Sequence, residues 1–66
     1  MYSLIECPIW LVEPGDHIWV DEAIKHKVLA VAFPGFILVD WGGFEAWVSL
    51  LEVELAEYIL LKPTHF

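Results

Sequence analysis

The residues best suited to chemistry flank the pair Gly42-Gly43, where two carboxylates and three aromatic rings follow one another closely. They are Asp40, Trp41, Phe44, Glu45 and Trp47. An aromatic face attracts an alkylammonium group by about 0.5–2 kcal/mol, and nearby carboxylates add to that attraction. One hypothesis is therefore a ligand-binding pocket for a cation such as a methylated lysine. The alternative is that Asp40 and Glu45 are two like charges at the solvated end of a sheet.

Other patterns give little support for catalysis or metal binding. His17 and Asp21 would share one face of a strand but lie about 13 Å apart, too far for one metal ion. Cys7 is the single cysteine, which excludes an intrachain disulfide and a zinc site built from several thiolates. Neither G-x-x-x-x-G-K nor H-E-x-x-H occurs in the sequence. We therefore expect a protein that is not an enzyme and that uses no metal or other cofactor.

The charge of the chain limits the class of partner. Ten acidic residues stand against three lysines and no arginine, so the formal net charge is −7. Proteins that bind nucleic acid directly rely on a basic surface for their affinity. We therefore expect no direct contact with nucleic acid. The acidic surface either serves solubility or favours a basic protein partner.

The hydropathy of the chain predicts no membrane span. The longest uncharged run after residue 27 is Val28–Val39, twelve residues with Pro34-Gly35 at its centre. A transmembrane helix needs about 20 apolar residues. The N-terminal residues also lack the basic opening of a signal peptide. These observations favour a cytoplasmic protein without a membrane partner.

The turn pairs Pro34-Gly35 and Gly42-Gly43 divide residues 28–49 into three apolar runs, which predicts a three-stranded antiparallel meander. Residues 13–16 predict a turn, and the alternation at 17–21 predicts a half-buried strand that follows it. Residues 1–12 suit an extended edge segment, and a last strand is expected over 58–62, ending at Pro63. Residues 51–55 alternate as a strand does, yet Ser49-x-x-Glu52 also matches a helix capping box, so a strand or one short helical turn is expected there.

Pairing across Gly42-Gly43 would set Trp41 opposite Phe44, Val39 opposite Ala46 and Ile37 opposite Val48. Val28, Ala30 and Ala32 would extend the same face through the first turn, with an offset of one residue possible because an L-Pro-Gly turn matches hairpin twist poorly. The predicted core residues are Ile18, Val20, Val28, Ile37, Val39, Val48 and Leu55.

The opposite face of the meander would carry six further apolar side chains: Leu29, Val31, Phe33, Phe36, Leu38 and Trp47. A patch of this size exceeds what a monomer usually exposes. Three explanations remain open: the terminal segments 1–12 or 51–62 cover it, copies of the chain associate through it, or another protein docks there. In the last case Trp47 would be the anchor, because buried tryptophans dominate interface energetics. The acids Glu45, Glu52 and Glu54 complete this predicted protein-binding surface.

The turn Pro14-Gly15-Asp16 before a strand, the meander, Trp47-Val48 at its end and the final run Glu57–Leu61 together resemble small barrels of the Src-homology-3 and Tudor type. The resemblance spans residues 13–62 and lies in the rhythm of turns and strands. It implies an all-β, five- or six-stranded antiparallel barrel. From its length of 66 residues, the chain is expected to form one such domain over residues 1–66. It also favours a binding module over an enzyme, and Tudor-like barrels often contain aromatic cages for cations.

The resulting functional hypothesis is an acidic, non-catalytic module that docks on a basic protein and can inhibit it. A nucleic-acid-handling protein is one such partner. The alternatives are an aromatic-cage binder of a cationic ligand and a homo-oligomeric structural subunit.

Overall fold

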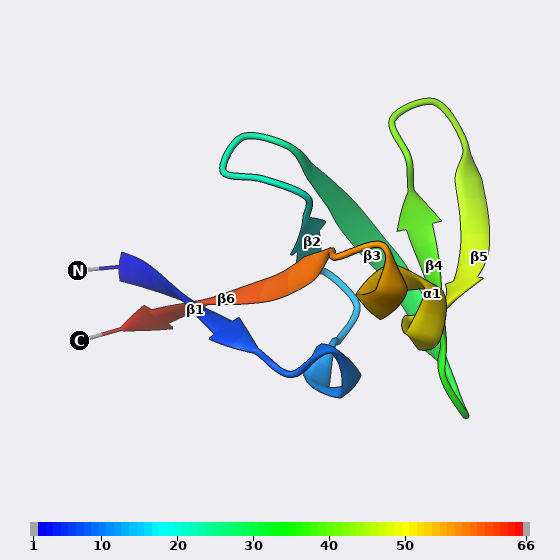
Figure 1. The fold of residues 1–66 in the computed structure, drawn as a ribbon, viewed down its shortest axis with the longest axis horizontal. Helices are drawn as coiled ribbons and strands as arrows, with labels where there is room; N and C mark the ends of the chain where they lie inside the picture. Colours follow the sequence, from blue (N-terminus) through cyan, green and yellow to red (C-terminus); the bar gives the residue numbers. More distant parts are fainter. Residues whose placement is uncertain (1, 66) are drawn as a thin grey trace.

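The computed structural model describes the backbone of residues 2–65 and the side chains of residues 3–64. Six strands form one antiparallel sheet in the order β1-β6-β2-β3-β4-β5, with two short helices packed against it (Figure 1). The elements in chain order are β1 (Tyr2–Cys7), the 3-10 helix η1 (Ile9–Leu11), β2 (His17–Trp19), β3 (Lys25–Ala32), β4 (Phe36–Asp40), β5 (Glu45–Ser49), α1 (Leu50–Leu55) and β6 (Ile59–His65). The predicted antiparallel β architecture with little helix is confirmed.

The sheet does not close into a barrel, which corrects the sequence-based expectation. β1 pairs only with β6 and β5 pairs only with β4, so the two outermost strands remain edges. The reason lies in β6, which pairs with β2 over 59–61 and with β1 over 60–65. Beyond residue 61, β1 and β6 therefore form a two-stranded ribbon that leads away from β4 and β5 (Figure 1).

The turn between β4 and β5 forms as the glycine pair predicts. Gly42 has a φ of +92°, a conformation that glycine adopts without steric cost. The Asp40 carboxylate accepts a hydrogen bond from the Gly42 N–H at 2.9 Å, and the Trp41 N–H donates to the Phe44 carbonyl at 2.8 Å. The predicted pairs Ile37–Val48 and Val39–Ala46 follow directly, and these pairings are confirmed.

A β-bulge interrupts the pairing of β3 with β4. The register passes from Val28 opposite Val39 to Ala30 opposite Leu38, which leaves Leu29 as the extra residue. The turn that follows contains a cis Phe33–Pro34 peptide bond. An offset of one residue was expected in this hairpin, and the bulge is where it occurs.

The bulge exchanges the faces of the residues that follow it. Residues directly opposite one another in an antiparallel pair project to the same face. Val31 lies opposite Ile37, on the core side, whereas Ala30 pairs with Leu38 and Ala32 with the exposed Phe36, on the opposite side. The expectation that Ala30 and Ala32 share the core face and that Val31 lies opposite is therefore wrong beyond Leu29.

Residues 50–55 form the short helix α1 rather than a strand. The Ser49 hydroxyl accepts a hydrogen bond from the Glu52 N–H at 3.1 Å, as an N-cap does. Glu57 ends the helix with a φ of 65°, and its N–H donates to the Glu54 carbonyl while the Tyr58 N–H donates to Val53. These are the two hydrogen bonds of a Schellman C-cap.

Two predicted core residues lie outside the core. Leu55 is 74% exposed because the helix turns Val53 inward in its place. Val20 lies past the end of β2, where its N–H donates to the Ile24 carbonyl, and it is also exposed.

The predicted end of the last strand is wrong, because β6 continues through Pro63. At this position only β1 lies beside β6, so the proline nitrogen, which has no hydrogen to donate, can face the edge without a partner strand.

The core lies on one face of the sheet, which we call the inner face, beneath η1 and α1. Its buried residues come from both ends of the chain as well as from the meander: Ile9, Val12, Ile18, Val28, Ile37, Val39, Val53 and Leu60. Val48 is half-buried and packs against this cluster. The terminal segments thus cover the inner face of the sheet.

Candidate functional site

The uncovered side of β3, β4 and β5 carries three of the six predicted apolar binding residues. Leu38 on β4 lies opposite Trp47 on β5, and Phe36 lies two residues before Leu38 on β4. Phe36 is 46% exposed and Trp47 is 52% exposed, while Leu38 is half-buried between its neighbours in the sheet. We call this surface the outer face and define it as Ala30, Ala32, Phe36, Leu38 and Trp47.

The other three predicted residues lie elsewhere. Val31 and the exposed Phe33 line a concavity of about 280 Å³ between η1 and the β3–β4 turn, together with Trp10 and Leu50. Leu29 is the half-buried bulge residue. The structure thus divides the single predicted surface into an outer face and an apolar concavity, which share Ala32.

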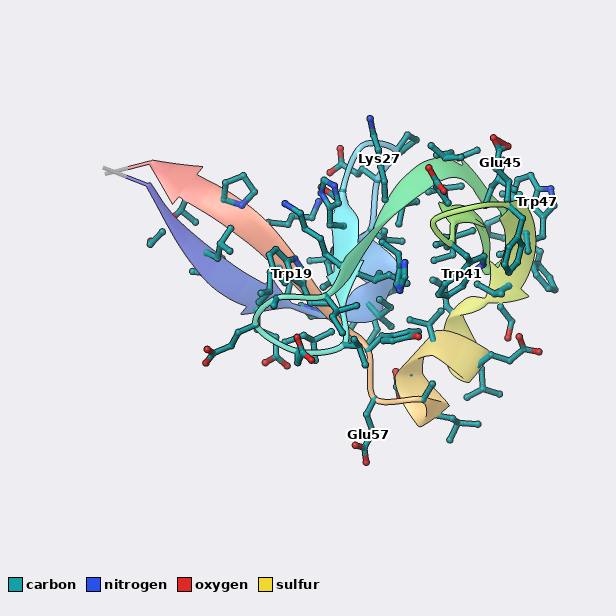
Figure 2. The ribbon with its side chains drawn as sticks, turned by 90° about the horizontal axis from the view of Figure 1, so that it is seen from above. Trp19, Lys27, Trp41, Glu45, Trp47 and Glu57 are labelled. Carbon is teal, nitrogen blue, oxygen red and sulfur yellow. The ribbon has the colours of Figure 1, made fainter. Side chains whose placement is uncertain are left out.

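Two acids stand at one end of the outer face. Asp40 and Glu45 are directly opposite each other where β4 and β5 meet their connecting turn, and both are exposed. Figure 2 shows Glu45 close to Trp47. The other two predicted acids, Glu52 and Glu54, are exposed on α1, where Glu54 borders a concavity of about 320 Å³ that Glu6 and Glu57 also line.

The five residues of the predicted cation pocket are not brought together. Trp41 follows Val39 on the inner face, where it packs against the core, whereas Trp47 lies opposite Leu38 on the outer face. Phe44 is exposed in the turn. The aromatic residues that flank Gly42-Gly43 therefore do not lie on one face of the sheet.

An aromatic cluster that the sequence did not predict forms around Trp41. Its ring centroid lies 4.8 Å from that of His26 and 5.8 Å from that of Tyr58. Trp41 and Tyr58 also line a concavity of about 180 Å³ with the Glu52 side chain at its border. Positions 26, 41 and 58 are far apart in the chain and share no motif, so no spacing signal could have indicated this cluster.

The charges of the chain are only partly balanced internally. Among residues 3–64, ion pairs join Lys62 to Glu13 at 3.0 Å and to Asp16 at 3.1 Å. Burial alone would lower the pKa of Lys62, but its hydrogen bonds to Glu13 and Asp16 outweigh that effect and raise the pKa. The remaining acids in this part of the chain have no such cationic partner, so they present uncompensated negative charge.

The remaining polar residues show no further site. Lys25 lies over the ring of Trp19, 5.1 Å from its centroid. Burial, and then the charges of Lys25 and Lys27, lower the pKa of His17, against a smaller opposing effect of Asp16. Within the described residues, no group of three histidine, cysteine or acidic side chains is placed to hold a metal ion.

Neither helix in residues 2–65 is long and apolar enough to cross a membrane. Comparison with protein-family models, with curated proteins and with solved structures gives no match to this chain.

Proposed function

We propose that this chain is a non-catalytic protein-binding module whose outer face docks on a basic protein. The observation that carries the proposal is an uncovered Phe36–Leu38–Trp47 surface with the Asp40 and Glu45 carboxylates at its end. Exposed apolar clusters of this kind typically mark interaction sites. In a complex, Trp47 would supply most of the binding energy as a buried anchor, while the acids would steer the encounter.

The net charge of −7 favours a partner with a basic surface, and nucleic-acid-handling proteins form one large class of such partners. An acidic module seated on that surface would compete with nucleic acid and so inhibit its partner. A Src-homology-3-like or Tudor-like fold is part of the same proposal. It is supported by the return of β6, after the short helix α1, to pair with the first strand of the β2–β5 meander.

The test compares wild-type chain with Leu38→Asp and Leu51→Asp as bait in a capture experiment. Leu51 is exposed on α1, so its variant has the same charge change away from the outer face. We expect basic proteins to bind wild type and Leu51→Asp, and to be lost from Leu38→Asp while its circular dichroism spectrum stays native. Capture of the same proteins by all three chains would contradict docking at the outer face.

A second candidate is a site for a cationic ligand, at a position different from the pocket that the sequence predicted. Trp41 and Tyr58 offer two aromatic walls, and Glu52 offers a carboxylate, at the same concavity of about 180 Å³. The faces of the two rings would attract an alkylammonium group, and the carboxylate would add to that attraction.

The test titrates trimethyllysine peptides into wild type, Glu52→Gln and Glu54→Gln, with tryptophan fluorescence as the readout. Both glutamates are exposed on α1, but only Glu52 borders this concavity. Saturable binding that is weakened by Glu52→Gln alone would support the site. No saturable change at millimolar peptide would contradict it.

A further inference from the structure

The free edge of β1 is the feature that the proposed function does not use. On one side β1 pairs with β6 from residue 2 to residue 7, and on its other side no strand of residues 2–65 pairs with it. Backbone N–H and C=O groups on that edge therefore lack strand partners. An unpaired strand edge is a template for pairing with another chain. We propose that β1 pairs antiparallel with β1 of a second copy, joining two sheets across a twofold axis.

The ribbon that β1 belongs to has little support of its own. Beyond residue 61, β6 has only β1 beside it, so two strands extend from the body without a third. A two-stranded ribbon is marginally stable in water unless it packs on other structure. Leu4 is 52% exposed and Ile5 is 46% exposed. Pairing with a second copy would give this ribbon a third and a fourth strand.

Natural edge strands are often protected from such pairing by charged side chains, a proline or a bulge. β1 reads Tyr-Ser-Leu-Ile-Glu-Cys and pairs with β6 without a register shift. It contains no lysine, proline or bulge, and Glu6 is its one charged side chain. The partner strand β6 does contain a proline, Pro63, which has no N–H to donate to a further strand. The edge available for pairing is thus that of β1.

The sequence of β1 allows a second copy as the occupant of this edge. Glu6 is the one charged residue of β1, and it lines a concavity with Glu54 and Glu57. Pairing centred on Leu4 or on Ile5 sets Glu6 opposite Tyr2 or Leu4 of the other copy, so no like charges face each other. The opposite edge strand, β5, carries Trp47 and borders the outer face, which the proposed function assigns to a basic partner.

The test measures the molar mass of the full chain by sedimentation equilibrium over a range of concentrations, in a reducing buffer so that Cys7 forms no disulfide. The variants are Leu4→Lys and Leu51→Lys, which place the same charge on two exposed leucines. We expect wild type and Leu51→Lys to form dimers with equal affinity. Leu4→Lys should weaken the dimer by roughly tenfold or more while its circular dichroism spectrum stays native.

A second measurement locates the axis. Antiparallel pairing across a twofold axis sets one residue of β1 beside its own copy, with Cβ atoms about 5 Å apart. In a Cys7→Ser background, Leu4→Cys or Ile5→Cys should therefore cross-link on mild oxidation, and Leu51→Cys should not. Failure of both β1 variants to cross-link would overturn the proposal.

Two other results would also overturn it: a wild-type chain that is monomeric up to millimolar concentration, or a dimer that persists in Leu4→Lys. If Leu38→Asp dissociates the dimer and Leu4→Lys does not, the copies associate through the outer face instead. Because Leu4→Lys leaves the outer face intact, it should still capture the basic partner. Failure of self-pairing is thus separable from failure of the proposed function.

Discussion

Trp47 on β5 and Leu4 on β1 are both 52% exposed and lie on the two opposite edge strands of the sheet. Both have acids nearby: Trp47 lies near the Asp40–Glu45 pair, and β1 carries Glu6, which lines a concavity with Glu54 and Glu57. Exposed apolar area and charge alone therefore do not distinguish the two regions. The backbone does, since Trp47 belongs to the outer face of β3, β4 and β5, whereas β1 is the free edge of a two-stranded ribbon.

The largest expected effect tests whether the two regions belong to one cooperative unit. Ile37 from β4 and Leu60 from β6 are both fully buried in the same core. Ile37→Ala and Leu60→Ala should each lower the free energy of unfolding by about 2–5 kcal/mol. Urea unfolding should show one transition, with fluorescence and circular dichroism changing together. Leu51→Ala is the exposed control, and separate transitions would mean that the ribbon half unfolds by itself.

The next effect isolates the outer face. Trp47→Ala should weaken partner binding by about 2 kcal/mol or more, mainly through faster dissociation, because a buried tryptophan anchors an interface. Surface plasmon resonance with the captured partner measures both rate constants. Trp10→Ala removes another exposed tryptophan, from η1, and should leave the rates unchanged. Equal losses in the two variants would indicate a site that includes η1.

Salt should weaken association at the outer face without weakening association at the β1 edge. Association with a basic partner should slow by about tenfold or more as salt rises from low to high concentration, because screening removes the steering by exposed charges. Dimerisation at β1 should be unchanged or strengthened, because salt screens the repulsion between two chains of charge −7. A partner association rate that does not respond to salt would leave the charge with a role in solubility alone.

A smaller effect concerns the link between β6 and the turn before β2. Lys62→Met should lower the free energy of unfolding by about 1 kcal/mol, since it leaves the half-buried Asp16 carboxylate without its cation. Because the pKa of Lys62 is raised, the contribution of this pair should persist up to the ordinary lysine pKa of 10.5 and disappear as pH rises through the raised value. Lys27→Met makes the same charge change at an exposed site, and an equal loss there would contradict a specific role for the ion pair.

The smallest effect is a pH dependence at His17. Burial, followed by the charges of Lys25 and Lys27, lowers the pKa of His17 below the ordinary 6.5. Below pH 6.5, His17 therefore binds a proton more readily in the unfolded chain than in the folded chain. His17 should therefore leave stability unchanged above pH 6.5 and lower it as pH falls through that value. Thermal unfolding of His17→Asn should lack this component. The same pH response in both chains would show that another group is responsible.

Local signals predicted much of the meander and little of what surrounds it. The glycine pair fixed the register of β4 with β5 as far as Ile37 and Val48, because a tight turn determines which residues face each other. The bulge at Leu29 was not located, since residues 28–33 are all apolar and show no alternation whose phase an extra residue could shift. The faces assigned to Val31 and Ala30 were therefore exchanged.

Long-range pairing was beyond what the sequence patterns indicate. No local sequence pattern indicates that β1 pairs with β6, or that the hydroxyl groups of Ser3 and Thr64 form a hydrogen bond of 2.9 Å. The region 51–55 satisfied both a strand pattern and a helix cap, and the helix turns Val53 rather than Leu55 into the core. The Trp41–His26–Tyr58 cluster was missed for the same reason, because three separate elements assemble it.

The bulge at Leu29 determines which side chains of β3 reach the outer face. If β3 and β4 paired regularly beyond Val28 with Leu29 retained, Leu29 would lie opposite Leu38, Leu29 and Val31 would turn outward, and Ala30 and Ala32 would turn to the inner face. The outer face would gain branched side chains and the concavity near Trp10 would lose one, although no residue of the sequence is changed. Deleting Leu29, in contrast, would remove the extra residue and keep the present faces of Ala30, Val31 and Ala32. The surface that a partner meets here thus depends on one pairing choice as much as on the residues themselves.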